Sequence, residues 1–323
     1  MRLLVGSRGS RLSLVQSEHV ISLLKHVDSS IEFEIVTIKT KGDIDARPLY
    51  TIDGKGVFEK EVDQAVLSGS VHLAVHSMKD VPSDLHEDLL IASVPRRDSP
   101  YDMLISKAQG HSLTSLPSKS VIGTSSLRRI VQLKRVRGDL VVKPIRGNVD
   151  TRIGKMLDGE YDAVVLAEAG LARLGLVSGL VQRSCFFERL SKDIMMPAPG
   201  QGALAVVVRK DSKDLIRLLK RIEDRASRAE IEAERVLLRE MNAGCRMPLG
   251  ALARAYPSGL LTLEACIISA DGRDVVRVGS SSSIDDAEGL GARVARSLLE
   301  QGARRISEEW RLIDFEHNNL SIQ

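Results

Sequence analysis

The sequence has few aromatic residues and no long apolar run. Phe, Trp and Tyr make up 3% of its 323 residues, which argues against the aromatic platforms that stack single-stranded nucleic acid. No stretch approaches the run of about 20 apolar residues that crosses a bilayer. The N-terminal MRLLVGSRGSRLSL also lacks the apolar core of a secretory signal. We therefore expect a cytoplasmic protein with no membrane or nucleic-acid partner.

Neither sign of charge is in large excess. Lys and Arg number 46 against 43 Asp and Glu, a formal net charge of +3, which is too small to indicate a polyanionic partner. Apolar residues at 43% and charged residues at 28% are ordinary for a globular protein, and the length suits two or three domains. No GxxxxGK[ST] loop is present, which disfavours a transferase of phosphorylated substrates.

The three cysteines are too far apart to form a CxxC metal or redox pair, and we expect no metal site. Cys185 lies beside two phenylalanines and Cys266 inside a predicted strand, so both are expected in the core. Cys245 lies in AGCRMPLG, between a glycine and a proline turn, where Arg246 would favour a thiolate. From the residues alone, Cys245 is equally well a reactive thiol or a small turn residue.

Strand and helix patterns alternate over the first two-thirds of the chain, which predicts an α/β fold with largely parallel sheets. Two stretches rich in proline or glycine, PRRDSPYD (95–102) and MMPAPGQGA (195–203), indicate crossings between domains. After Lys210 a long helical pattern precedes grouped strands and a last helix, which is typical of a separate α+β domain. The predicted domains are a first lobe of residues 1–97 and 199–216, an inserted second lobe of residues 98–198, and a C-terminal α+β domain of residues 217–323.

Periodicity also predicts the individual elements. Strands are expected at 2–5, 31–38, 71–75, 89–94, 121–123, 140–142, 163–166, 204–208, 251–255, 260–268 and 275–278. Helices are expected at 12–27, 57–67, 126–136, 149–157, 222–241 and 285–301, and the serines 280–283 are expected to form a loop.

Basic side chains gather directly after the predicted strands. Ligands of open α/β sheets bind at the carboxyl ends of the strands, although most Lys and Arg residues of any protein are simply solvated. Asp43 and Asp80 are the main acids at these ends. The cations there are Arg8, Lys39, Lys41, Lys79, Arg128, Arg129, Lys143, Arg146 and Arg152.

Arg128 and Arg129 favour a functional interpretation. They fall in the first turn of a predicted helix, where a cation opposes the helix dipole. That placement suits a helix N-terminus that binds an anion, and arginine can hold a carboxylate or phosphate with two parallel hydrogen bonds. Asp80, in HSMKDVP, is then a carboxylate among cations, suited to act as acid, base or cation stabiliser. Lys55, in DGKGVF, is by itself a loop residue, and His76 a structural one.

Eight motifs occur in order over nearly the whole chain: GSRGSRLSLVQ, KTKGD, DGKGVFEKEVD, AVHSMKDVP, IGTSSLRR, PIRGNVDTRIGKMLDGEYDAVVLAEAGLARLGL, PAPGQGA and GCRMPLG. Each is weak alone, but the ordered set resembles the porphobilinogen deaminases. The resemblance implies two lobes like those of type II periplasmic binding proteins and a smaller C-terminal α+β domain. It implies that four porphobilinogen units lose ammonia and join head to tail into 1-hydroxymethylbilane, in a monomeric enzyme of tetrapyrrole biosynthesis.

The resemblance also implies residue roles. A dipyrromethane primer made from substrate would be attached to Cys245 through a thioether, with Asp80 as the catalytic carboxylate. The cofactor would be bound by Lys79, Asp80, Ser125, Arg128, Arg129 and Arg146, and the substrate by Arg8, Ser10, Lys55, Arg146, Arg152 and Gln201. The family commonly has Gln, Pro, Arg and Gln where this chain has Gly9, Arg11, Tyr101 and Arg246.

The implied chemistry agrees with the cationic strand ends. Each porphobilinogen carries an acetate and a propionate, so a growing chain accumulates negative charge that arginine can bind. A non-catalytic anion-binding protein or effector domain would also use such a site, but it would have no use for Cys245 or Asp80. A colour test with Ehrlich's reagent for bound dipyrromethane separates the two possibilities.

Overall fold

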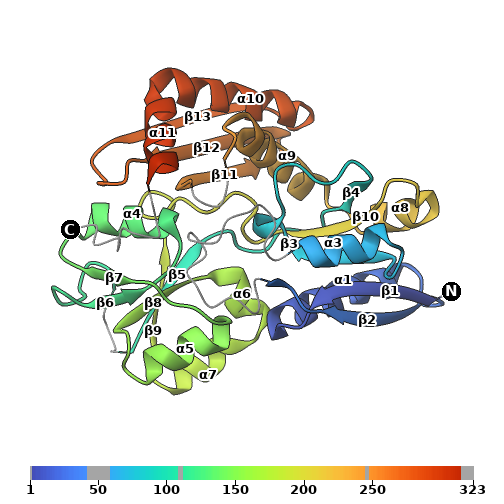
Figure 1. Ribbon diagram of the computed structural model, residues 1–323, viewed down its shortest axis with the longest axis horizontal. Coiled ribbons are helices and arrows are strands. Elements are labelled where there is room, and N and C mark those ends of the chain that lie inside the picture. Colours follow the sequence, from blue (N-terminus) through green and yellow to red (C-terminus); the bar gives the residue numbers. More distant parts are fainter. Residues whose placement is uncertain (1, 42–58, 108–111, 244–246, 314–323) are drawn as a thin grey trace.

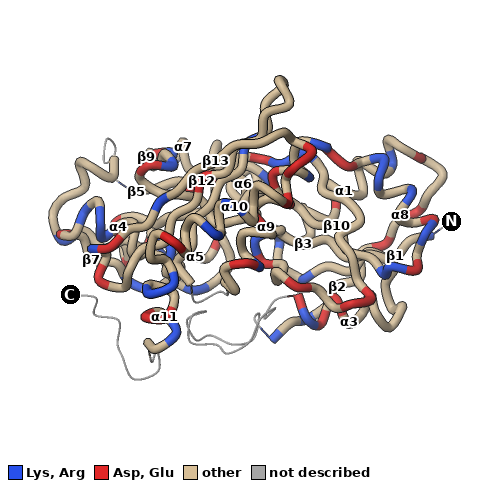
Figure 2. Tube along the Cα trace, turned by 90° about the horizontal axis from the view of Figure 1, so that it is seen from above, with Lys and Arg blue, Asp and Glu red and all other residues tan. Residues whose placement is uncertain are grey.

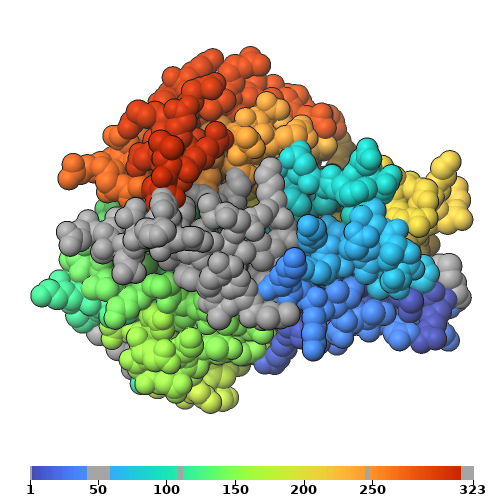
Figure 3. All heavy atoms as spheres, in the orientation of Figure 1, coloured from blue at the N-terminus to red at the C-terminus, as the bar shows by residue number. Residues whose placement is uncertain are grey.

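In the part of the chain that the structure describes, three β-sheets form the framework, and the smallest, with its helices, lies across the other two (Figure 1). The computed structural model describes residues 2–41, 59–107, 112–243 and 247–313. In the space-filling view the C-terminal domain, orange to red, rests on both lobes (Figure 3). The expected fold class, two α/β lobes with a smaller C-terminal α+β domain, is confirmed. Within these ranges no helix combines the length and apolar character needed to cross a bilayer.

The first lobe is a five-stranded sheet with helices on both faces. Its elements are β1 (Arg2–Arg8), α1 (Arg11–Val27), β2 (Glu32–Ile38), α3 (Lys60–Leu67), β3 (Leu73–Ser77), the 3-10 turn η2 (Met78–Asp80), β4 (Leu89–Ser93), β10 (Leu204–Arg209) and α8 (Lys213–Lys220). The strand order is β2-β1-β3-β10-β4, and β10 runs antiparallel to both of its neighbours. Leu73 and Val75 share one core with α1 and α8, whereas Ala74 packs with α3. Because both faces are covered, β3 is an almost unbroken apolar run.

The second lobe repeats this arrangement with the strand order β7-β6-β8-β5-β9. Its elements are β5 (Asp102–Ser106), β6 (Val121–Gly123), α4 (Leu127–Val136), β7 (Val141–Lys143), α5 (Val149–Leu157), β8 (Ala163–Ala167), α6 (Glu168–Arg173), α7 (Leu176–Gln182) and β9 (Phe186–Leu190). Val164 faces a core formed with α5, α6 and α7, and Val165 faces one formed with α4. The chain enters this sheet after β4 and leaves it before β10.

The C-terminal domain packs helices against a three-stranded antiparallel sheet. Its elements are α9 (Arg225–Glu240), β11 (Leu249–Ala255), β12 (Leu260–Ile268), β13 (Val275–Ser283), the 3-10 turn η3 (Ile284–Asp286), α10 (Ala287–Leu298), the π-helical turn η4 (Leu299–Ala303) and α11 (Arg304–Leu312). Trp310 is buried in its core, and the indole N–H donates to the carbonyl of Ile268 at 2.8 Å. A Cβ added to Gly291 would lie 2.5 Å from the Ala233 carbonyl oxygen, so α9 and α10 need glycine for their close approach.

The structure differs from the sequence predictions in several elements. The serines 280–283 form no loop: they extend β13, and Ser280 and Ser283 pair with Leu263 and Leu260 of β12. β13 is an edge strand of its sheet, so its backbone can pair with β12 while hydroxyl side chains face solvent. The predicted helix 222–241 begins only at Arg225, because Asp224 caps it. The strands β5 and β9 and the helices α6, α7, α8 and α11 were not predicted.

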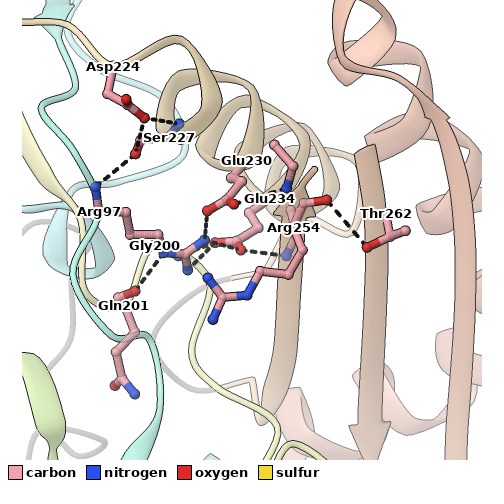
Figure 4. Close-up of polar contacts among 11 residues, drawn as sticks. Arg97, Gly200, Gln201, Asp224, Ser227, Glu230, Glu234, Arg254 and Thr262 are labelled. Carbon is pink, nitrogen blue, oxygen red and sulfur yellow. Dashed lines mark hydrogen bonds and ion pairs between the residues drawn. The ribbon is translucent and has the colours of Figure 1, made fainter. Parts of the chain in front are cut away.

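A buried arginine ties the C-terminal domain to both chain crossings (Figure 4). Arg97, in the first crossing, donates from Nη1 and Nη2 to the two carboxylate oxygens of Glu234 on α9, at 2.8 and 3.1 Å. Nη1 also donates to Glu230 at 3.2 Å, and Nε donates to the carbonyl of Gln201, in the second crossing, at 2.9 Å. Burial opposes the charge of Arg97, but the two glutamates outweigh it and raise its pKa above the ordinary value. Both crossings are therefore held to α9 through the guanidinium of Arg97.

Candidate functional site

The carboxyl end of β3 leads directly into the turn that carries Lys79 and Asp80. β3 is the central strand of its sheet, and η2 follows it without a linking residue. Gly200 packs on the back of this turn: its φ is +77°, and an added Cβ would lie 2.9 Å from the backbone nitrogen of Lys79. Asp80 is half-buried, and its carboxylate accepts no hydrogen bond from the residues that the structure describes. The turn therefore offers an available carboxylate beside a lysine.

Arg128 and Arg129, in the first turn of α4, are buried around an internal carboxylate. They are 5% and 6% exposed, and Asp102, the first residue of β5, is 0% exposed. Arg129 donates from Nε and Nη2 to Oδ1 of Asp102 at 3.0 and 2.7 Å, and Nη2 of Arg128 lies 2.8 Å from Oδ2. The Nη1 atoms donate to the carbonyls of Met196 (from Arg128, 2.6 Å) and Val165 (from Arg129, 2.8 Å). Nε of Arg128 is buried with no partner among the described residues.

Nothing in the sequence pattern singles out Asp102. It is the last residue of the proline-bracketed stretch 95–102. The one available signal is that an acidic residue stands directly before an apolar strand, where a buried carboxylate would require a charged partner. Burial acts to raise the pKa of Asp102, but the charges of Arg128 and Arg129 outweigh it and hold that pKa below its ordinary value. Part of the anion expected beside α4 is therefore supplied by the protein itself.

Arg146 and Arg152 extend the group of cations toward the first lobe. Both are half-buried, and Nε of Arg152 donates to the carbonyl of Gly147 at 2.8 Å. Burial, with the charges of Arg129 and Arg146, lowers the pKa of Arg152 to about 10, and Asp80 partly offsets them. Since such charges act over short distances, Arg152 of the second lobe and Asp80 of the first face the same space.

Ser125 fixes the segment that carries Arg146. Its side chain is buried, and Oγ donates to the carbonyl of Ile145 at 2.8 Å while it accepts from the Ile145 N–H at 3.0 Å. The hydroxyl thus makes its hydrogen bonds with the backbone directly before Arg146. This contact positions a cation and accounts for a serine at this place.

The side chain of Lys79 reaches solvent, yet the protein around it shifts its pKa. The protein around it removes enough water to lower its pKa to about 8, and Arg129 and Arg128 act in the same direction, whereas Asp80 and Asp102 oppose them. A group with this pKa is still mostly protonated at neutral pH. We call Lys79, Arg128, Arg129, Arg146 and Arg152 the cationic cluster.

Three other predicted site residues lie around this cluster or support it. Arg8 ends β1, which pairs with β3, and is half-buried. Ser10 caps α1, where its Oγ accepts from a backbone N–H three residues on at 3.2 Å. Gln201 is 1% exposed, and its Nε2 donates to the carbonyl of Pro100 at 2.6 Å and to Oδ1 of Asp102 at 3.1 Å. Gln201 is therefore one of the residues that bind the carboxylate of Asp102.

Two predicted residues, Lys55 and Cys245, lie outside the described residues. The other two cysteines are core residues, as expected: burial raises the pKa of Cys185, and it raises that of Cys266 to about 11. Both are therefore neutral thiols at pH 7. His76 is also buried, with Nε2 2.9 Å from a carboxylate oxygen of α3, in agreement with a structural role.

The cluster is chemically suited to a ligand that carries several anionic groups. It combines cations from both lobes, and the buried Nε of Arg128 is a donor without a partner in the described part of the chain. Arginine N–H donors bind carboxylates or phosphates strongly. Within the same ranges, no three His, Cys, Asp or Glu side chains gather as they do around a metal ion.

Comparison with known proteins agrees with the resemblance of the motifs. The family model "Porphobilinogen deaminase, dipyromethane cofactor binding domain" matches residues 3–217, and "Porphobilinogen deaminase, C-terminal domain" matches residues 228–300. The chain is 47% identical to a probable porphobilinogen deaminase of Nitrosopumilus maritimus, over 96% of this chain and 97% of that one. It is 43% identical to the porphobilinogen deaminase of Thermus thermophilus, over 94% and 97%. The solved structure of the periplasmic aliphatic sulphonate binding protein SsuA from Escherichia coli is matched with a TM-score of 0.41 and 12% identity, over 75% of this chain and 70% of that one.

Proposed function

Because the chain belongs to the porphobilinogen deaminase family, and so catalyses the hydroxymethylbilane synthase reaction of tetrapyrrole biosynthesis with a dipyrromethane cofactor, we propose how its residues divide this work. Cys245 holds the cofactor through a thioether, and Asp80 acts at the reacting pyrrole. The cationic cluster binds the acetate and propionate groups of cofactor and substrate. The observation that carries this proposal is the convergence of cations from both lobes around the carboxylate of Asp80.

The cationic cluster fits a dipyrromethane, which bears an acetate and a propionate on each pyrrole. Arg128 offers a buried donor with no partner among the described residues, and Arg146 and Arg152 are half-buried and reach the same space. When bound, the cofactor supplies the free pyrrole carbon to which the first substrate unit is joined. The arginines hold its carboxylates with charge-assisted hydrogen bonds and so fix the pyrrole rings relative to Asp80.

Asp80 is placed to act on the substrate's aminomethyl group. Ammonia departs with the electrons of the C–N bond, which leaves positive charge on the substrate's pyrrole. A carboxylate stabilises that charge, and it can hold the proton of a pyrrole nitrogen or of the leaving amine. Within the described residues the Asp80 carboxylate accepts no hydrogen bond, so it is available for this role.

The strand that follows Cys245 in the sequence supports its attachment role. β11 begins at Leu249, four residues after Cys245. A Cβ added to Gly250, a little further on, would lie 2.8 Å from the side chain of Met196, whose carbonyl accepts from the Arg128 guanidinium. β11 therefore packs against the residue that binds Arg128 of the cationic cluster, and the two other thiols are buried and neutral.

We also propose the domain division of the sequence analysis, with lobes of residues 1–97 plus 199–216 and 98–198, and a C-terminal domain of 217–323. What supports it is that β10 joins the sheet of β1–β4, whereas β5–β9 form their own. The proposed partner is porphobilinogen alone, for a cytoplasmic monomer without nucleic-acid or membrane partners. Both signs of charge are interspersed along the trace (Figure 2), which supports the proposed lack of a nucleic-acid partner. Sedimentation of the purified protein tests the monomer.

Cofactor assembly should depend on pH through Lys79. The pKa of Lys79 is about 8, so its charge is present below that pH and lost above it. The loss of one charge-assisted hydrogen bond should slow adduct formation by about tenfold. We expect the rate at which protein stripped of cofactor gains the adduct from porphobilinogen, followed by intact mass, to fall as the pH rises through about 8.

The Lys79→Arg variant is the control, because its guanidinium stays protonated over that range. Its assembly rate should be flat with pH. An identical fall in wild type and Lys79→Arg would show that another group is responsible.

Replacing Arg146 by leucine should impair assembly and early elongation without unfolding the protein. Arg146 is half-buried and is not part of a hydrophobic core, so leucine should leave the packing of the lobe intact. Arg128→Leu differs, because it takes a partner from the fully buried Asp102 and should cost about 3–5 kcal/mol of stability. Arg146→Lys should restore little of the lost assembly and elongation, because lysine lacks the planar guanidinium that binds a carboxylate through two parallel hydrogen bonds. Melting temperature, adduct mass and turnover check these expectations, and full adduct content with normal turnover in Arg146→Leu would contradict the role of Arg146.

A further inference from the structure

We propose that Asp102 is a positioning residue of this active site. It holds the guanidinium groups of Arg128 and Arg129 in the orientation in which their remaining N–H donors can receive ligand carboxylates. The inference rests on the proposed function, since it takes the cationic cluster as the binding site of the acetate and propionate groups. Asp102 itself acts through the two arginines and touches neither cofactor nor substrate.

The backbone of Asp102 is fixed on both sides. β5 lies between β8 and β9, and Asp102 pairs with Ala167 on one side and Leu190 on the other. Its side chain is 0% exposed. A carboxylate at such a place cannot swing into solvent to make way for a ligand, so it is a permanent partner of the arginines.

The contacts of Asp102 determine how each guanidinium is turned. Oδ1 accepts from both Nε and Nη2 of Arg129, which fixes the plane of that guanidinium. Oδ2 lies 2.8 Å from Nη2 of Arg128. While Nη2 of Arg128 is held by Asp102, the buried Nε of Arg128 has no partner within the described residues. This Nε–H therefore remains a donor for another acceptor.

The position of Asp102 is in turn linked to the crossings between domains. Gln201 donates from Nε2 to Oδ1 of Asp102 at 3.1 Å, and its carbonyl accepts from Nε of Arg97 at 2.9 Å. Arg97 is bound by Glu234 of the C-terminal domain (Figure 4). A continuous run of polar contacts therefore joins α9 to the arginine pair through Asp102.

The charge of Asp102 is needed as well as its shape. Lys79, Arg128 and Arg129 lie close enough for their charges to act on one another. With Asp102 neutral, two adjacent buried guanidiniums would have lost their shared counter-charge, and repulsion would turn them apart. A purely structural Asp102 would affect stability alone, whereas a positioning residue must also affect how tightly substrate is bound.

The experiment compares Asp102→Asn and Asp102→Glu with the wild type and a matched control. Glu168→Gln is that control: it also removes a carboxylate from the second lobe, but one that pairs with Arg189 and Ser99. Each purified variant is measured for melting temperature, adduct mass, and kcat and KM for porphobilinogen on its adduct-bearing fraction. The KM of Asp102→Asn should rise about tenfold or more, because hydrogen bonds to charged groups are misaligned. Asp102→Glu keeps the charge at a displaced position and should lie between Asp102→Asn and wild type, and Glu168→Gln should keep the wild-type KM within about twofold.

A folded Asp102→Asn protein with wild-type KM would overturn the proposal, whatever its melting temperature. If Asp102→Asn does not fold, Asp102→Glu decides: a raised KM supports positioning, and a wild-type KM overturns it. The wild-type measurement distinguishes failure of the Asp102 proposal from failure of the proposed function. A wild-type protein without adduct or turnover would contradict the function itself.

Discussion

Cys245→Ala should yield a folded protein with no bound dipyrromethane and no measurable turnover. The attachment requires a soft nucleophile that adds to the electrophilic exocyclic carbon left when ammonia departs, and a thiolate is suited to this. The resulting thioether is stable enough to persist through every cycle, unlike an ester or a disulfide. Alanine has no nucleophile, and the hydroxyl of Cys245→Ser is protonated and far weaker at neutral pH. The expected fall in turnover is on the order of a thousandfold or more.

Intact-mass spectrometry with peptide mapping checks this result. The wild type should be heavier than its sequence by two pyrrole units, on the peptide that contains Cys245, and the variant should lack that mass. Cys185→Ala and Cys266→Ala are the controls, since both thiols are buried, and each should keep the adduct at a modest cost in stability. An adduct mapped to Cys185 or Cys266, or an unmodified wild type that turns over substrate, would refute the assignment.

Asp80→Asn should retain the adduct and the fold while losing most of its turnover. Asparagine has nearly the same shape, but it carries no charge to stabilise the cation left by ammonia, and it cannot exchange a proton at neutral pH. The expected fall in kcat is about a hundredfold or more, which corresponds to a loss of about 2.7 kcal/mol of transition-state stabilisation. Asp80→Ala should be no milder.

Asp88→Asn provides a matched control for the charge change. Asp88 is an exposed carboxylate of the first lobe, whose contact with His86 is 3.7 Å, and its replacement should leave kcat within about twofold. Single-turnover kinetics on protein that already carries the adduct separates chemistry from assembly. Near wild-type kcat in adduct-bearing Asp80→Asn would show that another group performs the proton transfer.

The sequence alone determined the fold class and much of the sheet framework. The buried strand β3 is nearly continuous in apolar residues and α1 has helical spacing, and both follow from local periodicity. Shorter or less regular elements such as β9, α7 and α8 have weaker signals, and they were missed. Four consecutive serines predict a loop at Ser280–Ser283, and only their pairing with β12 makes the segment a strand.

The sequence likewise identified the candidate site, because the carboxyl ends of parallel strands meet at one edge of a sheet. Lys79 and Asp80 follow β3 directly, and Arg128 and Arg129 follow β6 at the start of α4. This rule needs no knowledge of distant contacts, only the order of strand, turn and helix. The order of the motifs added the family, and with it the expectation for Cys245.

The tertiary structure decided which partners these residues have. Asp102 is separated from Arg128 by 26 positions in the sequence, and only the pairing of β5 inside the second sheet places its carboxylate against both arginines. Arg97 likewise acquires its role from glutamates on α9, more than a hundred residues away. Local pattern can show that a residue is charged and where its strand ends, but burial and long-range pairing determine which opposite charge stands beside it and so how its donors are turned.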